Sequence, residues 1–372
     1  KFSKEGKAYK PGDLWVQEDL ARTLERIAED GREGFYEGET ADLIVAEMQR
    51  GGGIITHEDL KNYKSVWRDP IYGTYRGYDI YGMGPPSSGG VLVQQMLNML
   101  ESYDLRRMGY GSSSLAHLMI EAERRAFADR AEYLGDPDFV NVPISILTLK
   151  EYAKYRMRDF DPDKATPSDD IGAGRWPPES PETTHFSVMD GRGMMVAFTT
   201  TLNSGYGNKV VVPGAGFLMN NEMDDFSIKP NVENQFQLTG GKANAIEPGK
   251  RMLSSVAPTI VMQGNRPVLI TGSPGGSTII TTVLQVIINA LDHEMPLNDA
   301  VSLPRFHNQW KPDQVLTETY TFSPETLHSL QQRGHILRPA SFPLGDANSI
   351  MMKAGLMHGM SDPRGGGAAV GF

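Results

Sequence analysis

Residues 267–291 read PVLITGSPGGSTIITTVLQVIINAL, which is an apolar strand, a glycine-rich turn and an apolar helix in direct succession. Glycines in the turn let backbone amides point toward a ligand, and the amino end of the following helix favours negative charge. The turn could therefore be a phosphate cradle or an oxyanion hole for acyl transfer. A P-loop is not indicated, because no Lys precedes Ser277 and Thr278. A turn that serves only tight packing is an equally open interpretation.

Two hairpins are predicted on the amino-terminal side of this stretch. Segments THFSVMD (184–190) and MMVAFTTTL (194–202) flank the turn Asp190-Gly191-Arg192-Gly193, and a second hairpin runs through APTIVMQGNRPVLITGS (257–273). A helix over 277–291 follows directly. The pattern predicts a mixture of strands and helices without the regular βαβ spacing of a dinucleotide-binding fold.

The first half of the chain is mainly helical in pattern. Helices are expected at 17–30, 40–50, 56–63, 91–103 and 112–134, the last of them long and amphipathic. Thr56 and Asp59 are placed to cap the third helix. Aromatic alternation at 71–83 predicts a β pair. The segment SDDIGAGRWPPESPE (168–182) has the composition of an exposed linker.

Composition excludes several classes of protein. The 372 residues carry 36 Lys or Arg against 46 Asp or Glu, and this net charge of -10 argues against a nucleic-acid partner bound through phosphates. Without cysteine there is no disulfide, thiolate metal site or cysteine nucleophile. The longest apolar stretch, 283–291, is too short to cross a bilayer, and the first residues show no signal peptide. We therefore expect a soluble, acidic, globular protein.

Other clusters are less specific. NNEMDDF (220–226) could bind a metal or hold an ammonium group, although a solvated turn is the commoner use of such a run. Hydroxyls in Leu253-Ser254-Ser255 and Thr199-Thr200-Thr201 could bind a carboxylate, but ordinary strand or turn content is favoured. The eight histidines show no HExxH pattern or ligand-spaced pair, so His307 is interpreted as a packed or surface imidazole and no metal site is predicted. No GxSxG elbow is present.

Taken together, residues 183–372 resemble the small subunit of γ-glutamyltranspeptidases. The segments that carry the resemblance are TTHFSVMD (183–190), TTLNSGYG (200–207), FLMNNEMDDFS (217–227), KRMLSS with APTIV (250–261), GSPGGS (272–277) and PRFHNQW (304–310). The first half resembles the carboxyl-terminal part of the family's large subunit, in DPIYGTYRGYDIYGMGPPSSGG (69–90) and FADRAEYLGDPDFV (127–140). Residues 1–182 and 183–372 would thus belong to two subunits cut from one precursor.

The resemblance implies an N-terminal-nucleophile hydrolase with a four-layer αββα sandwich of α+β class. Such a precursor cuts itself before a threonine, which here would be the bond between Glu182 and Thr183. A freed α-amino group titrates at about 7.7–8.0, so Thr183 would supply both nucleophile and base. No cofactor is implied.

The remaining roles follow from the same resemblance. Thr201 would bond the nucleophile's hydroxyl, and Gly275 and Gly276 would form the oxyanion hole. The donor's α-ammonium group would be held by Asn203, Glu222 and Asp225, and its α-carboxylate by Ser254 and Ser255. Phe236 stands where a lid tyrosine is common. No arginine of this chain matches the family's carboxylate-binding arginine, which would lie upstream of Lys1.

The function implied is transfer or hydrolysis of the γ-glutamyl group of glutathione-like donors, with water, an amino acid or a peptide as acceptor. A periplasmic or secreted enzyme without nucleic-acid partner or membrane span is expected. One alternative is a related amidase, such as a cephalosporin acylase or a poly-γ-glutamate-processing enzyme. Another is an immature, non-catalytic homologue.

Overall fold

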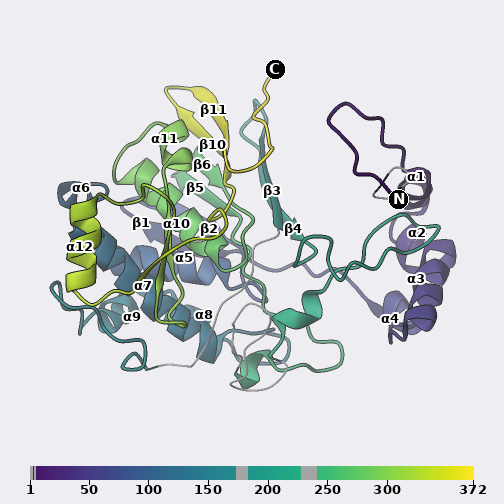
Figure 1. Cartoon of the computed structure of the whole chain (residues 1–372), viewed down its shortest axis with the longest axis horizontal. Helices are drawn as coiled ribbons and strands as arrows, with labels where there is room; N and C mark the ends of the chain where they lie inside the picture. Colours follow the sequence, from purple (N-terminus) through teal and green to yellow (C-terminus); the bar gives the residue numbers. More distant parts are fainter. Residues whose placement is uncertain (1–2, 4–5, 173–182, 228–240) are drawn as a thin grey trace. The chain divides into compact units, whose positions relative to one another are not determined.

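The computed structural model describes residues 3, 6–172, 183–227 and 241–372 (Figure 1). They form two compact units, one of residues 1–68 with 205–221 and one of residues 69–204 with 222–372. The predicted division at 182/183 concerns a cleavage position, which compactness does not test, so it stays a prediction.

Four helices form in the part of the smaller unit that the structure describes. These are α1 (Glu18–Asp30), α2 (Glu33–Tyr36), α3 (Gly38–Gly51) and α4 (His57–Asn62). Thr56 and Asp59 form the predicted cap, because the Thr56 hydroxyl accepts from the Asp59 amide while the Asp59 carboxylate accepts from the Thr56 amide. Ile44 and Val212 anchor the small core, and the Thr23 hydroxyl donates to the Ala215 carbonyl at 2.9 Å.

The described residues of the larger unit form three sheets. A six-stranded antiparallel sheet has the order β1-β2-β5-β6-β10-β11, and β3 and β4 form a separate antiparallel hairpin. Strands β7 to β9 form a small third sheet. The bounds are β1 (Ile71–Tyr75), β2 (Tyr78–Gly82), β3 (Thr183–Met189), β4 (Met195–Thr201), β5 (Thr259–Gln263), β6 (Arg266–Thr271), β7 (Phe306–Asn308), β8 (Val315–Thr317), β9 (Leu337–Pro339), β10 (Asn348–Lys353) and β11 (Leu356–Ser361).

Helices cover one face of the large sheet and the β3–β4 hairpin covers the other. Helix α5 packs on β1 and β2 and contacts α7 and α10, whereas the hairpin contacts β5, β6 and β10 (Figure 1). Leu269 joins the helix-side core, so its neighbour Ile270, also buried, faces the hairpin. The helices are α5 (Gly89–Leu100), α6 (Leu105–Met108), α7 (Ser113–Tyr133), α8 (Ile144–Leu147), α9 (Lys150–Arg156), α10 (Thr278–Leu291), α11 (Leu297–Ser302) and α12 (Pro324–Gln332). The helices, the six-stranded sheet and the β3–β4 hairpin lie in layers, and this arrangement confirms the α+β class.

The predicted helices and hairpins form close to their expected bounds. At two places, however, residues that were expected to be exposed are buried. Helix α7 is not amphipathic, since every residue from Leu115 to Ala131 is buried. Ser168, the first residue of the expected linker, is also buried, and its hydroxyl contacts Arg124 and the Trp310 carbonyl, whereas Asp169 and Asp170 beside it are exposed as expected. In both cases residues distant in sequence pair with some of the buried polar groups, as Asp313 does with Arg124 and Trp310 with Ser168. No helix in the described part of the chain is long and apolar enough to cross a membrane.

Candidate functional site

Thr183 opens strand β3, and the antiparallel register places it opposite Thr201, the last residue of β4. The Thr201 hydroxyl accepts from the backbone amide of Asn203 at 2.8 Å. Asn203 has a φ of +73° and is almost completely buried. The end of the hairpin therefore gathers three of the predicted site residues on adjoining backbone.

The glycine-rich turn leads from β6 into α10, as the sequence predicts. Gly275 has a φ of +132° and Gly276 a φ of +56°, a region that disfavours side chains. A Cβ on Gly275 would also lie 2.5 Å from the Thr278 hydroxyl. The turn lies at the amino end of α10, where free helix amides favour negative charge, so an oxyanion site at Gly275 and Gly276 stays a prediction.

His307 lies behind this turn as a packed imidazole. Its Nε2 is 2.7 Å from the Gln309 side-chain oxygen, and its Nδ1 is 2.8 Å from the Thr281 hydroxyl on α10. The Ser277 hydroxyl donates to the same Gln309 oxygen at 2.8 Å. Burial lowers the pKa of His307 to about 4, so the ring is neutral and supports the start of α10.

His185 connects the strand of Thr183 to the glycine-rich turn. A Cβ on Gly272 would lie 2.2 Å from the His185 ring, so only glycine fits where the turn crosses this imidazole. The ring is held between the hydroxyls of Thr199, at 2.8 Å, and Ser187, at 3.1 Å. Burial lowers the pKa of His185 to about 4. This neutral contact fixes the turn against β3.

Ser254 and Ser255 are held by the segment PPSSGG (85–90). The Ser254 amide donates to the Pro86 carbonyl at 2.8 Å, and the Ser88 amide donates back to the Ser254 carbonyl at 2.8 Å. Arg130 of α7, which is buried, donates to the hydroxyls of Ser88 at 2.9 Å and Ser255 at 3.0 Å. A guanidinium group thus stands directly behind the serine pair, a contact that no sequence motif indicated.

Asn244 links the acidic cluster to the serine pair. Glu222 and Asp225 lie in a short 3-10 helix, η1 (Glu222–Asp225). The Asn244 side chain donates to the Asp225 carbonyl at 2.6 Å and accepts from the Leu253 amide at 3.0 Å. Asn244 itself belongs to a second such turn, η2 (Lys242–Asn244), and is buried. Groups proposed for the two ends of a donor are therefore joined through one buried amide.

Two predicted site residues, Glu182 and Phe236, lie outside the described residues. Among the described residues, the one group of three side chains with metal-ligand geometry is His117, Glu121 and His335. The acidic cluster at 222–225 is not part of it, which leaves the ammonium interpretation of that cluster in place. Sequence spacing could not reveal the histidine pair, because 218 positions separate its members.

Comparisons with known proteins give consistent relatives. The family model described as Gamma-glutamyltranspeptidase matches residues 1–372. The chain is 50% identical over 367 residues to a glutathione hydrolase proenzyme of Escherichia coli (strain K12), covering 98% of this chain and 63% of that protein. It is 38% identical over 345 residues to acylase ACY 1 proenzyme of Pseudomonas sp. (strain SE83), covering 93% and 59%. It therefore spans less than two thirds of these relatives.

A solved structure confirms the type of fold. The cephalosporin acylase from Bacillus halodurans superposes with a TM-score of 0.83 at 29% identity, covering 97% of this chain and 63% of that one. The predicted sandwich of the N-terminal-nucleophile hydrolase type is thus correct.

Proposed function

Because this chain belongs to the γ-glutamyltranspeptidase family, we propose that it carries the acyl-transfer centre of a γ-glutamyl transferase and hydrolase acting on glutathione-like donors. The observation that supports this most directly is the position of Thr183. It begins β3 opposite Thr201, on the strand whose His185 packs against the glycine-rich turn. A nucleophile and an oxyanion-binding turn then belong to one rigid assembly, as acyl transfer requires.

Activation of Thr183 depends on cleavage of the bond that precedes it. In an uncut chain the nitrogen of Thr183 is a peptide amide and cannot accept a proton. Cleavage after Glu182 releases an α-amino group, which can take the proton of the Thr183 hydroxyl as the oxygen attacks. This step also separates residues 1–182 and 183–372 into the two proposed subunits.

The chemical step follows from the proposed roles. The Thr183 oxygen adds to the γ-carbonyl carbon of the donor, and the amides of Gly275 and Gly276 stabilise the resulting oxyanion. The carbon–nitrogen bond then breaks, the leaving amine takes the proton from the α-amino group, and the glutamyl group stays as an ester on Thr183. Water, an amino acid or a peptide attacks the ester and restores the hydroxyl.

Recognition of the donor rests on its two charged ends. Asn203, Glu222 and Asp225 would hold the α-ammonium group, and Ser254 and Ser255 the α-carboxylate. Arg130 supports the second contact, because its guanidinium group donates to the Ser255 hydroxyl and leaves positive potential beside a bound carboxylate. This pair of subsites favours a γ-glutamyl donor over the glutaryl amides that lack an ammonium group.

An acylase is the second candidate function. It is favoured by the 38% identity to acylase ACY 1 proenzyme and by the superposition on a cephalosporin acylase. Comparing γ-glutamyl and glutaryl amides of one amine separates the two candidates. A γ-glutamyl amide turned over at least about tenfold faster supports the first, since loss of an ammonium contact costs more than 1.4 kcal/mol. Equal rates support the acylase.

Intact mass and amino-terminal sequencing of the full-length protein test self-cleavage. We expect a fragment that begins Thr183-Thr184-His185, and we expect Thr183→Ala to abolish both this fragment and turnover. Thr200→Ala is the matched control, because Thr200 neighbours Thr201 but lies exposed on the other face of β4. A Thr183→Ala protein that still cleaves and turns over would rule out this mechanism. A wild type that stays uncut and inactive would instead support the non-catalytic alternative.

Two further features complete the proposal. Phe236 in place of a lid tyrosine would leave the pocket cover without a hydroxyl contact, and Phe236→Tyr should then lower the KM for the donor. The enzyme is proposed to act in the periplasm or outside the cell, which fractionation of cells expressing the full-length protein would test.

A further inference from the structure

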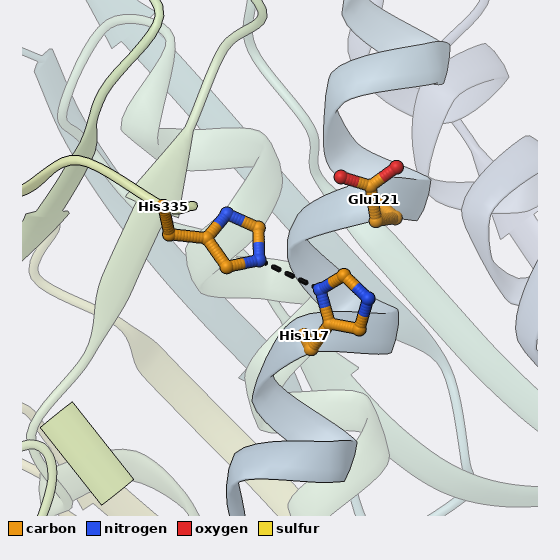
Figure 2. Close-up of side chains that lie close together, drawn as sticks. All are labelled: His117, Glu121 and His335. Carbon is orange, nitrogen blue, oxygen red and sulfur yellow. Dashed lines mark hydrogen bonds between the residues drawn. The ribbon is translucent and has the colours of Figure 1, made fainter. Parts of the chain in front are cut away.

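Two histidines and a glutamate converge in the helix-side core, apart from every residue assigned to acyl transfer. His117 and Glu121 lie one turn apart on α7, and His335 lies between α12 and β9. All three are buried, and one ligand atom of each lies within 4.8 Å of the others. Figure 2 shows the His335 ring facing His117, with Nε2 of His335 at 2.7 Å from Nδ1 of His117.

The hydrogen bonds of His117 direct one lone pair into this cluster. Its Nε2 lies 2.8 Å from the Asp161 carbonyl, which accepts only, so Nε2 carries the proton and Nδ1 does not. Histidines that bind a metal through one ring nitrogen commonly donate the N–H of the other nitrogen to a carbonyl or carboxylate. His117 has this arrangement.

Hydrogen bonding alone does not satisfy the histidine pair. If Nε2 of His335 donates to His117, then Nδ1 of His335 is a buried acceptor, and it has no hydrogen-bond partner among the described residues. This nitrogen is not one of the two that face each other across the pair. The observation that points to an ion is instead the convergence of the three ligand atoms.

Charges around the cluster are balanced. Glu121 contacts Arg124 at 3.5 Å and Arg125 at 2.5 Å. Each guanidinium group has a second acidic partner, Asp313 for Arg124 and Asp159 for Arg125. Arg333 is a third guanidinium group near the histidines, and it donates to the Pro162 carbonyl and the Ser329 hydroxyl. Three carboxylates thus offset three guanidinium groups, so a cation does not enter a net positive pocket.

We propose that His117, Glu121 and His335 form a buried site for a transition-metal ion of the zinc class, which ties α7 to the chain between α12 and β9. A set of two imidazoles and one carboxylate suits zinc, whereas magnesium and calcium prefer oxygen ligands without imidazole. Two nitrogens on one tetrahedral zinc ion lie about 3.3 Å apart, so the rings must separate by about 0.6 Å from their hydrogen-bonded distance. Small rotations of two side chains provide such a shift.

Titration of the full chain, stripped with chelator, tests the site directly. Co²⁺ should produce the visible absorption of a tetrahedral nitrogen and oxygen site, and elemental analysis should find one Zn²⁺ per chain. The thermal midpoint should rise by about 4 °C when free Zn²⁺ is about 100 times its Kd. Less than a tenth of an equivalent of bound ion (roughly the level of adventitious metal) would overturn the proposal and leave a hydrogen-bonded histidine pair.

Variants locate the bound ion. His335→Gln keeps an amide for hydrogen bonding but removes a ligand, and it should weaken Zn²⁺ binding about 100-fold or more. Glu121→Gln should do the same. His57→Gln is the matched control, because His57 is exposed and pairs with Asp42 on the surface, and its Kd should not change. Unchanged binding by His335→Gln would place the ion elsewhere and overturn the assignment; circular dichroism without metal checks that each variant folds.

Discussion

Helices α7 and α10 are both buried, and they use opposite chemistry. In α10, the residues from Thr278 to Ala290 are buried and mostly aliphatic, and its polar side chains bond to nearby groups, as Gln285 does with the Phe306 carbonyl at 2.7 Å. In α7, the buried stretch from Leu115 to Ala131 includes seven titratable side chains. These are His117, Glu121, Glu123, Arg124, Arg125, Asp129 and Arg130.

The difference shows that a helix can be buried for two reasons. Local sequence predicts the burial of an aliphatic helix, but it does not predict the burial of a charged one. An aliphatic helix such as α10 gains from leaving water regardless of its neighbours. A charged helix such as α7 can be buried only where its charges find partners. Some partners lie on the helix itself, as Arg125 does for Glu121, and others come from elsewhere in the chain, as Arg156 does for Asp129 at 3.0 Å. Substitutions in the two helices should therefore differ in the size of their effect on stability and in how that effect depends on pH.

Arg125→Met should have the largest effect on stability. The guanidinium group bonds to the Glu121 carboxylate at 2.5 Å, to Asp159 at 3.0 Å and to the Arg156 carbonyl at 2.8 Å, and almost none of it is exposed. Its removal leaves a buried carboxylate without its main partner, which costs about 3–5 kcal/mol. Chemical denaturation of the larger unit would measure the loss.

Two variants control for this prediction. Arg192→Met breaks an ion pair whose arginine is 90% exposed, and stability should stay within experimental error. Glu121→Gln combined with Arg125→Met removes the stranded charge and should recover part of the loss. If Arg125→Met proved as mild as Arg192→Met, the pairing of charges would not explain the burial of α7.

The pH dependence of His307, which lies between the two helices, should be the next largest effect. Its ring contacts Phe127 of α7 edge-on and Thr281 of α10. The pKa falls from an unfolded value of about 6.5 to about 4, so the unfolded chain binds more protons between these limits. Stability is therefore complete above pH 6.5 and decreases as the pH falls toward 4, by up to roughly 3 kcal/mol.

His307→Gln should flatten this decrease, because a neutral amide does not titrate. Unfolding curves of the variant and wild type between pH 4 and 7 give the comparison. The variant should lose stability at pH 7 but converge with wild type as the pH falls. Parallel curves across the range would mean that His307 is not neutral in the folded protein.

Much of the fold could be predicted from local pattern. The 3.6-residue period gave α1 and α10, and alternation with turn residues gave the β3–β4 and β5–β6 hairpins. Strands β7 to β9 have three residues each, too few for alternation to show. The prediction that α7 is amphipathic was wrong, because the sequence does not show whether water or another residue pairs with a charged side chain.

The candidate site was predictable where a motif is contiguous and unpredictable where it is not. Thr183, Thr201, Gly275 and Gly276 were named from the family resemblance that short contiguous segments carry, and their roles remain proposals. Arg130 could not be named, because the Ser255 that it contacts is 125 positions away. Asn244 carries no motif, and only the fold shows that its amide joins η1 to Leu253, the residue before Ser254.

Glu123→Gln should have the smallest effect, although it changes an acidic residue in the core. Burial raises the pKa of Glu123 well above its usual range, so its carboxyl is neutral where it accepts from the Asn308 amide at 2.8 Å. Near pH 4.5 the change should be under about 1 kcal/mol, no more than the effect of Ile287→Val in α10. As the pH rises to 7 the wild type must keep this group protonated, whereas the unfolded chain releases the proton, so the variant should become relatively more stable. Denaturation of both variants at the two pH values makes the comparison. A loss at pH 7 as large as that of Arg125→Met would show that Glu123 is ionised and that α7 holds one more buried charge than its partners balance.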